Sequence, residues 1–179
     1  YLDYETERSE LLLRQECLCE GWEIPITPSI LYRRQYVPFA DDVGRLQSLI
    51  LDTGANVIII DSIGAACAAE LNTSETALRF FSALRSLKNV TSILIAHTSK
   101  DTEGRKSPYG SAYFKNYARS VWEIRKSQEA GANTLNIGMF HLAANNSKLA
   151  LPIGLNIDFR SDDNDNLQQV IVTPQDVKT

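Results

Sequence analysis

The sequence predicts an α/β fold, with a mainly parallel sheet flanked by helices and an antiparallel meander at the carboxyl end. Two short apolar runs rich in β-branched residues, at 56–60 and 90–96, are each followed by a polar residue, as is typical of strands buried in a parallel sheet. Helical patterns separate these runs, which indicates right-handed βαβ crossovers. The 179 residues are 44% hydrophobic, enough for a single domain, 1–179, with a substantial core.

The first part of the chain, residues 1–118, contains the predicted βα repeats. Glycines follow two of the helical patterns, at Gly21 and Gly54, where helices commonly end. A third helix is expected to begin at Thr73-Ser-Glu-Thr and to end at Leu84 or Leu87. Strands are expected at 1–4, 30–33, 56–60 and 90–96, and the first two helices at 6–20 and 41–52.

The second part, residues 119–179, has a different pattern. Four further strands joined by short polar turns indicate an antiparallel meander, with strands at 120–125, 134–142, 153–159 and 168–172. The acidic run 162–166 is expected to be a turn of this meander. It does not fit an EF-hand calcium loop, because no bidentate Glu follows at the required spacing.

Charge, hydropathy and cysteine content exclude several classes of protein. The formal net charge of -4 argues against a generally basic nucleic-acid binder, although a local basic loop is compatible with it. No stretch approaches the roughly 20 apolar residues that span a bilayer, and no secretory signal opens the chain. The three cysteines lack the CxxC spacing of a metal site, so reduced thiols in a cytoplasmic protein are expected.

The strand that ends at Asp61 is the strongest single signal of a functional site. An ionised carboxylate at the carboxyl end of a buried strand is costly without a partner, so it is expected to face a crevice. In nucleotide-hydrolysing α/β proteins this pattern is the Walker B strand, whose Asp holds the Mg²⁺ of the bound nucleotide. The structural alternative is that Asp61 caps the turn that begins at Ser62.

Two other strand ends carry candidate residues. Glu5 follows the first strand and could orient or deprotonate an attacking water, or it could favour the start of the next helix through the helix dipole. His97 follows the strand 90–96 and could contact a terminal phosphate, or it could be an ordinary hydrogen-bonded histidine. The polar loop after it, 101–110, could contact a nucleic-acid backbone or could simply be solvated.

Taken together, these segments resemble the RecA-like ATPases, and among them the hexameric replicative helicases of the plasmid RepA type and their phage relatives. The resemblance covers residues 1 to about 159. It rests on Tyr1-Leu-Asp-Tyr-Glu5, Val57-Ile-Ile-Ile-Asp61-Ser62, Ile95-Ala-His97-Thr-Ser-Lys100, Gly110-Ser111 and Asn116-Tyr-Ala-Arg119.

The resemblance implies a role for each matching residue. Glu5 would activate water, Asp61 with Ser62 would hold Mg²⁺ and ATP, and His97 would sense the γ-phosphate. Arg119 would be an arginine finger that reaches the nucleotide of a neighbouring subunit. The loop after the strand 90–96 would contact single-stranded DNA through Lys100, Arg105 and Lys106.

Two departures from the family pattern affect this interpretation. The phosphate-binding motif GxxxxGK[ST] does not occur in the 179 residues, and in the family it lies just upstream of the strand that opens this chain. The chain is therefore expected to be a fragment whose phosphate-binding loop precedes Tyr1. Relatives also often carry a lysine where Ala143 stands, and Lys126 or Lys148 are the candidates to replace it.

The sequence therefore supports two hypotheses of different class. The first is the motor domain of an oligomeric ATPase, a hexamer that acts on single-stranded DNA. The second is a non-hydrolysing assembly or DNA-binding module that kept the fold and lost the phosphate-binding loop. An ATPase that remodels a protein partner, such as a recombination factor, lies between them.

Overall fold

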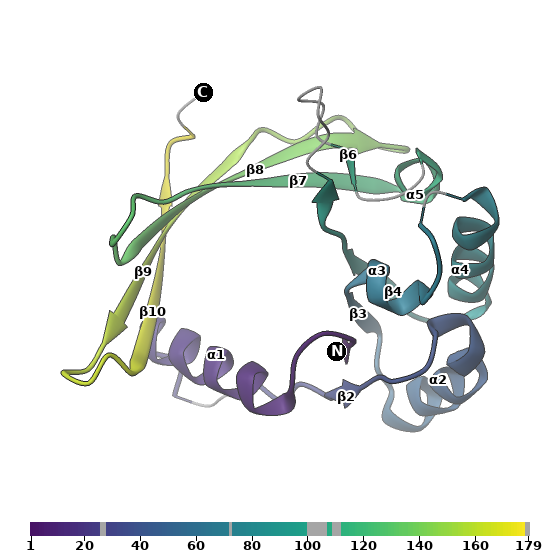
Figure 1. The fold of residues 1–179 in the computed structure, drawn as a ribbon, viewed down its shortest axis with the longest axis horizontal. Helices are drawn as coiled ribbons and strands as arrows, with labels where there is room; N and C mark the ends of the chain where they lie inside the picture. The colour runs from purple at the N-terminus through teal and green to yellow at the C-terminus, as the bar shows by residue number, and fades with distance from the viewer. Residues whose placement is uncertain (26–27, 72, 100–106, 109–111, 178–179) are drawn as a thin grey trace. The chain divides into compact units, whose positions relative to one another are not determined.

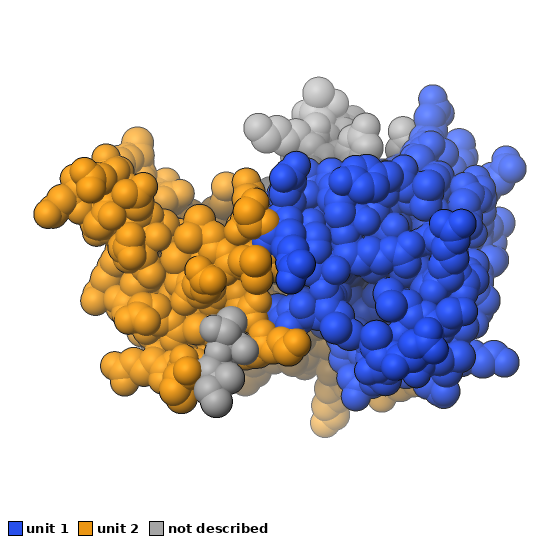
Figure 2. Space-filling view, turned by 90° about the horizontal axis from the view of Figure 1, so that it is seen from below, with its two compact units in different colours: residues 1–8, 30–118 blue, residues 9–29, 119–179 orange. Residues whose placement is uncertain are grey.

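The structure is a computed structural model that describes residues 1–25, 28–71, 73–99, 107–108 and 112–177. These residues form two compact units, which are coloured separately in Figure 2. The first unit contains residues 1–8 and 30–118, and the second contains 9–29 and 119–179. Each unit is described on its own.

The first unit is built on a four-stranded parallel sheet in the order β2-β1-β3-β4 (Figure 1). The register pairs Asp3 with Asp61, and Asp61 with Ile95. Because the strands are parallel, residues that follow these three positions lie at the same edge of the sheet. The strands are β1 (Leu2–Asp3), β2 (Arg33–Arg34), β3 (Val57–Asp61) and β4 (Thr91–Ile95).

Local signals explain where the helices of this unit begin and end. Helix α2 (Phe39–Thr53) ends at Gly54, whose φ of 68° is left-handed and therefore favours glycine. Helix α4 (Ser74–Ser86) is capped by Thr73, whose side chain accepts a hydrogen bond from the backbone N of Thr76 at 3.3 Å. These two helices confirm the predictions from the sequence. Two short helices, α3 (Ile63–Cys67) and α5 (Ala112–Tyr117), and a small antiparallel pair, β5 (Thr98–Ser99) with β6 (Ser107–Pro108), were not predicted.

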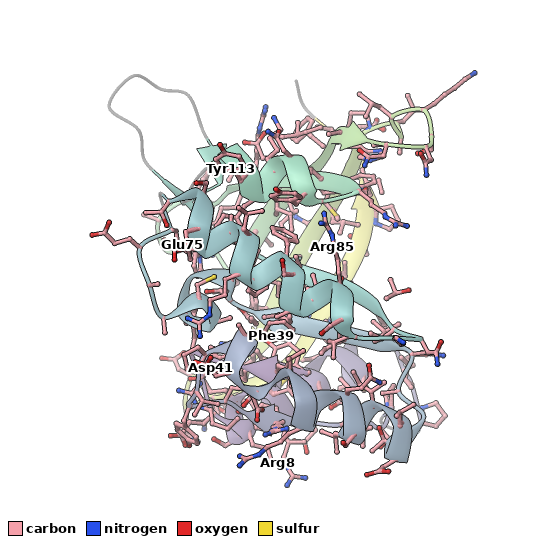
Figure 3. All side chains as sticks on the ribbon, turned by 90° about the vertical axis from the view of Figure 1, so that its right-hand side faces the viewer. Arg8, Phe39, Asp41, Glu75, Arg85 and Tyr113 are labelled. Carbon is pink, nitrogen blue, oxygen red and sulfur yellow. The ribbon has the colours of Figure 1, made fainter. Side chains whose placement is uncertain are left out.

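The core of the first unit lies between the sheet and these helices. Phe39 of α2 packs on Phe80 of α4 with ring centroids 5.1 Å apart, and Phe81 packs on Phe114 of α5 at 5.7 Å. Figure 3 shows α4 from outside, with Glu75 near its start and Arg85 near its end. The buried phenylalanine side chains of this core, at positions 39, 80, 81 and 114, each stabilise the fold by roughly 1.5–3 kcal/mol. The cluster also includes Leu2, Leu46, Ile58, Ile60, Ile63 and Ala66.

The prediction that β3 and β4 are buried on both faces is wrong. Ile58 and Ile60 point into the core, with 5% and 0% of their surface exposed, whereas Val57 is 47% exposed. In β4, Ile93 is 51% exposed. Side chains alternate along a strand, so one face of the sheet meets the helical core and the other carries the exposed residues. Strand β4 also forms an edge of the four-stranded sheet, which leaves its side chains with neighbours on one side only.

The second unit contains the predicted antiparallel meander and one helix. Strands β7 to β10 pair in the order β10-β9-β8-β7. Helix α1 (Arg8–Gly21) approaches β10 closely, because a Cβ placed on Gly21 would lie 1.9 Å from the carbonyl O of Val170. Gly21 is therefore required by this approach as well as by its place at the helix end. The strands are β7 (Ser120–Ser127), β8 (Thr134–Ala144), β9 (Ile153–Ser161) and β10 (Leu167–Gln175).

Three further predictions can be compared with the described residues. The acidic segment 162–166 is a turn, in which the Asp162 carboxylate accepts hydrogen bonds from Asn164 N and Asn166 N, each at 2.9 Å. Cys17, Cys19 and Cys67 are free and buried. In the part of the chain that the structure describes, no helix has the length and apolar character needed to cross a membrane.

Candidate active site

A pocket of about 620 Å³ opens at the carboxyl ends of β1, β3 and β4. Glu5 follows β1, Ser62 follows β3 directly, and His97 follows β4, so the parallel register brings all three to one place. The strand order also reverses here, because β2 lies on one side of β1 while β3 and β4 lie on the other. Ligands of open α/β sheets commonly bind at such a reversal. The pocket is lined by Glu5, Ser62, Gly64, Ala65, Ala69, Glu70, Leu71 and His97.

Glu5 is the centre of the polar contacts in this pocket. Its Oε1 accepts a hydrogen bond from Oγ of Ser62. Nε2 of His97 lies 3.2 Å from Oε1 and 3.3 Å from Oε2 of the same carboxylate, so with Nε2 protonated the imidazole donates to Glu5. The Ser62 side chain is buried, whereas those of Glu5 and His97 are 37% and 69% exposed. The carboxylate is thus held from its inner side and accessible to a ligand from the pocket.

Asp61 lies beside this group at the end of β3. Its Oδ2 accepts a hydrogen bond from the hydroxyl of Tyr1. The residue in the N-cap position of α3 is Ser62, and no side-chain hydrogen bond caps that helix. The Asp61 carboxylate therefore does not cap the following turn, which was the structural alternative to a role in binding. Ser62, which was predicted to contact the cofactor, donates its hydroxyl to Glu5.

The segment Asp3-Tyr4-Glu5 was predicted to carry chemistry through Glu5, and no role was assigned to Asp3, the last residue of β1. It is 1% exposed, and its carboxylate accepts hydrogen bonds from the backbone N of Glu5 at 2.9 Å and of Thr6 at 2.8 Å. Oγ1 of Thr6 and the hydroxyl of Tyr32 donate to Oδ2 at 2.6 and 3.1 Å, and Nη1 of Arg34 lies 3.3 Å from Oδ1. Burial by itself raises the pKa of Asp3, but the hydrogen bonds from Thr6, Glu5 and Tyr32 outweigh it and lower the pKa.

A local signal could have identified Asp3. An Asp side chain that accepts from the backbone N–H groups two and three residues later forms a turn, and Asp is enriched in turns for this reason. The segment Asp3-Tyr-Glu5-Thr6 has that spacing directly after a strand. The burial of Asp3 and its contact with Arg34 depend on the pairing of β1 with β2, which the sequence does not reveal.

The donor set at the end of β3 can be compared with the needs of a metal ion. No cluster of three or more His, Cys, Asp or Glu side chains that could hold a metal occurs among the described residues. Mg²⁺ in nucleotide sites is commonly bound through one or two carboxylates, with water and phosphate oxygens as the other ligands. The carboxylate of Asp61, with Glu5 in the segment that follows the adjacent strand β1, fits that requirement. It does not fit a metal held by protein ligands alone.

The remaining predicted residues belong to the second unit or lie outside the described residues. Arg119 belongs to the second unit, where its side chain is exposed and its carbonyl O accepts from Asn145 N at 3.0 Å. Ala143 lies in β8, paired with Val121 of β7. Lys100, Arg105 and Lys106, the candidate DNA contacts, lie outside the described residues, as do Gly110 and Ser111.

Comparisons with known proteins identify the fold. No family model and no curated protein matches the sequence. Solved structures do match: the KaiC-like protein of the archaeon Pyrococcus horikoshii is 16% identical, with a TM-score of 0.58, and the match covers 97% of this chain and 74% of that one. The flagellar accessory protein FlaH of Methanocaldococcus jannaschii is 15% identical, with a TM-score of 0.52, covering 99% of this chain and 76% of that one.

The fold is RecA-like. The parallel sheet of the first unit and the antiparallel sheet of the second are both included in these matches, since each covers nearly the whole chain. At 15–16% identity the likeness establishes the RecA-like fold and leaves the chemistry to the residues of the pocket.

Proposed function

We propose that the chain is part of a RecA-like ATPase that hydrolyses ATP at the pocket between the ends of β1, β3 and β4. The observation that carries this proposal is the carboxylate of Glu5, held by Oγ of Ser62 and lying 3.2 Å from Nε2 of His97 at the strand-order reversal of a RecA-like sheet. A carboxylate that is anchored on one side and exposed on the other suits a general base for water.

In this proposal each pocket residue has one role. Glu5 takes a proton from the water whose oxygen attacks the γ-phosphorus, while the bond to the β–γ bridging oxygen breaks and leaves ADP. His97 contacts the γ-phosphate and is displaced from Glu5 when that phosphate binds. Asp61, with Ser62 next to it, holds Mg²⁺, which neutralises phosphate charge when it is bound.

The phosphate-binding loop is the part of the site that the 179 residues do not supply. The motif GxxxxGK[ST] does not occur in these residues, so ATP binding needs such a loop from another part of the protein or assembly. Searching the coding sequence on both sides of these residues for the motif tests whether the protein supplies it. A protein without the motif would favour the alternative, a non-hydrolysing assembly or DNA-binding module.

The oligomeric and DNA-related parts of the proposal rest on the resemblance of motifs to the RepA-type helicases. Subunits would form a ring, hexameric in that family, and Arg119 would act on the nucleotide of the neighbouring subunit. Lys100, Arg105 and Lys106 would contact the phosphates of single-stranded DNA.

A matched pair of glutamate variants tests the site. In the full-length protein with Mg²⁺ and ATP, Glu5→Gln is expected to lower kcat by roughly 10²-fold or more, because the general base is lost, while nucleotide binding is retained. Glu7→Gln makes the same chemical change two residues later, at an exposed position outside the residues that line the pocket, and is expected to keep the wild-type rate. Equal rates for the two variants would contradict the role of Glu5.

The action on DNA is tested separately. ATP turnover is measured with and without single-stranded DNA, together with strand separation of a duplex that has a single-stranded tail. A helicase is expected to respond to the single strand and to separate the duplex. Turnover indifferent to DNA, with no strand separation, would instead favour an ATPase that remodels a protein partner, and DNA binding without any turnover would favour the non-hydrolysing module.

A further inference from the structure

We infer that Asp3 is a positioning residue that holds Glu5 in place for hydrolysis, an inference that rests on the function proposed above. Asp3 does not line the pocket. Among the described hydrogen bonds of its side chain, Glu5 is the one pocket residue that it contacts. It acts on Glu5 through the backbone of the segment between them.

The geometry of the turn links the two carboxylates. Oδ1 of Asp3 accepts from the backbone N of Glu5 at 2.9 Å and from that of Thr6 at 2.8 Å. These two bonds fix the peptide groups on both sides of the Glu5 Cα. The direction of the Glu5 side chain toward Ser62 and His97 therefore depends on Asp3.

The rest of the Asp3 environment holds the carboxylate itself. Arg34, which pairs with Asp3 across β1 and β2, places Nη1 at 3.3 Å from Oδ1, and Tyr32 donates to Oδ2 at 3.1 Å. Thr6 donates to Oδ2 through its hydroxyl at 2.6 Å. A carboxylate that is 1% exposed is costly to bury without such partners. These donors hold the Asp3 side chain in one orientation, and the Asp3 side chain in turn holds the backbone of Glu5 and Thr6.

Three variants of the full-length protein separate positioning from a general effect on folding. Asp3→Ala removes the acceptor of both backbone N–H groups and is expected to lower kcat roughly 10- to 100-fold with little change in KM for ATP, because the base is displaced while the nucleotide still binds. Asp3→Asn keeps Oδ1 as an acceptor and is expected to recover most of the rate. Asp41→Ala removes an exposed carboxylate that is not among the residues lining the pocket, and it is the matched control, with a rate near that of the wild type.

Rates are expressed per folded molecule, counted by nucleotide binding. If Asp3→Ala does not fold, Asp3→Ser replaces it, since its shorter side chain reaches fewer of the donors, and the same fall in kcat is expected. A variant that loses thermal stability but keeps the wild-type kcat per folded molecule overturns the inference.

A second readout does not depend on activity. The chain has two histidines, His97 and His141, so the NMR signals of the two imidazole rings can be assigned from single substitutions. Asp3→Ala and Glu5→Gln are both expected to shift the ring signal of His97, because both remove the carboxylate from Nε2. The signal of His141, which belongs to the second unit, is expected to stay in place.

The two readouts distinguish the inference from the proposed function. A wild-type protein without ATP turnover contradicts the proposed function, while the His97 signal still shows whether Asp3 places Glu5. In an active wild-type protein, an unchanged kcat in Asp3→Ala overturns the positioning role for hydrolysis. An unmoved His97 signal in Asp3→Ala overturns it in either case.

Discussion

Nε2 of His97 lies 3.2 Å from Oε1 of Glu5, although 92 residues separate the two in the chain. The contact exists because β1 and β4 both flank β3 in parallel register, so that the residues after their carboxyl ends meet at one edge. Both side chains are accessible to a ligand, and a γ-phosphate that binds to His97 would compete with Glu5 for the imidazole.

This competition gives a prediction for His97. His97→Ala is expected to lower ATP turnover and to remove any stimulation by single-stranded DNA, because the link between the phosphate and the loop after β4 is lost. The affinity for nucleotide is expected to fall by roughly tenfold at most, since a hydrogen bond contributes about 0.5–1.5 kcal/mol net and His97 gives up its contact with Glu5 to make it. Steady-state rates and equilibrium binding of a fluorescent ATP analogue measure the two effects. Retention of full DNA stimulation would contradict the role of His97.

Mixed oligomers test whether Arg119 acts on the neighbouring subunit. Arg119→Ala and Glu5→Gln are each expected to abolish most of the turnover on their own. If Arg119 acts in trans, a mixture of the two variants regains activity, because some interfaces then combine an intact Glu5 with an intact Arg119. The measurement is ATPase rate against mixing ratio.

The control for this experiment is another exposed arginine of the second unit. Arg160→Ala loses a surface pair with Asp158 and a hydrogen bond to Gln169, and is expected to leave turnover unchanged. A mixture of Arg119→Ala and Glu5→Gln that is no more active than its components would exclude the action in trans.

Two neighbouring ion pairs at the start of α2 provide a stability test. Asp42 is 2% exposed and lies 2.7 Å from Nη2 of Arg33, which is 30% exposed, whereas Asp41 and Arg79 are 49% and 56% exposed. Arg33→Met is expected to lower the free energy of unfolding by about 3 kcal/mol, because among the described residues it leaves the buried carboxylate of Asp42 with Gln35 alone as a side-chain donor, at 3.2 Å. Arg79→Met changes the charge by the same amount at an exposed pair and is expected to cost less than about 1 kcal/mol. Urea unfolding of both variants at neutral pH gives the comparison, and equal losses would contradict it.

The lowered pKa of Asp3 predicts how stability depends on pH. Its folded-state pKa lies below the usual value of 3.8, so its ionised form stabilises the native state above that pH. This stabilisation is lost as the pH falls through the lowered folded-state pKa. The difference in free energy of unfolding between wild type and Asp3→Asn is therefore expected to be constant from pH 7 to about 5 and to shrink below about pH 4. Urea titrations across this range test it, and a difference that grows toward acid pH would be inconsistent with it.

The parts of the fold that could be predicted have long apolar patterns or clear signals at the ends of helices. Helix α4 followed from its Thr73 cap and apolar spacing, and α2 from its spacing and Gly54. The helices that were missed, α3 and α5, have five and six residues, which is too short for a 3.6-residue period to repeat. The burial of β4 was overestimated because an apolar run has the same composition at the edge of a sheet as at its centre.

The candidate site could also be predicted only in part from the sequence. The sequence by itself determined that Glu5, Asp61 and His97 follow strands, because each stands at the end of a local apolar run. Only the tertiary structure decided that Ser62 and His97 meet at Glu5, and that Asp3 is buried under it against Arg34. The physical reason is that strand order, register and burial arise from pairings between distant segments. Composition and periodicity describe only the neighbours of a residue along the chain.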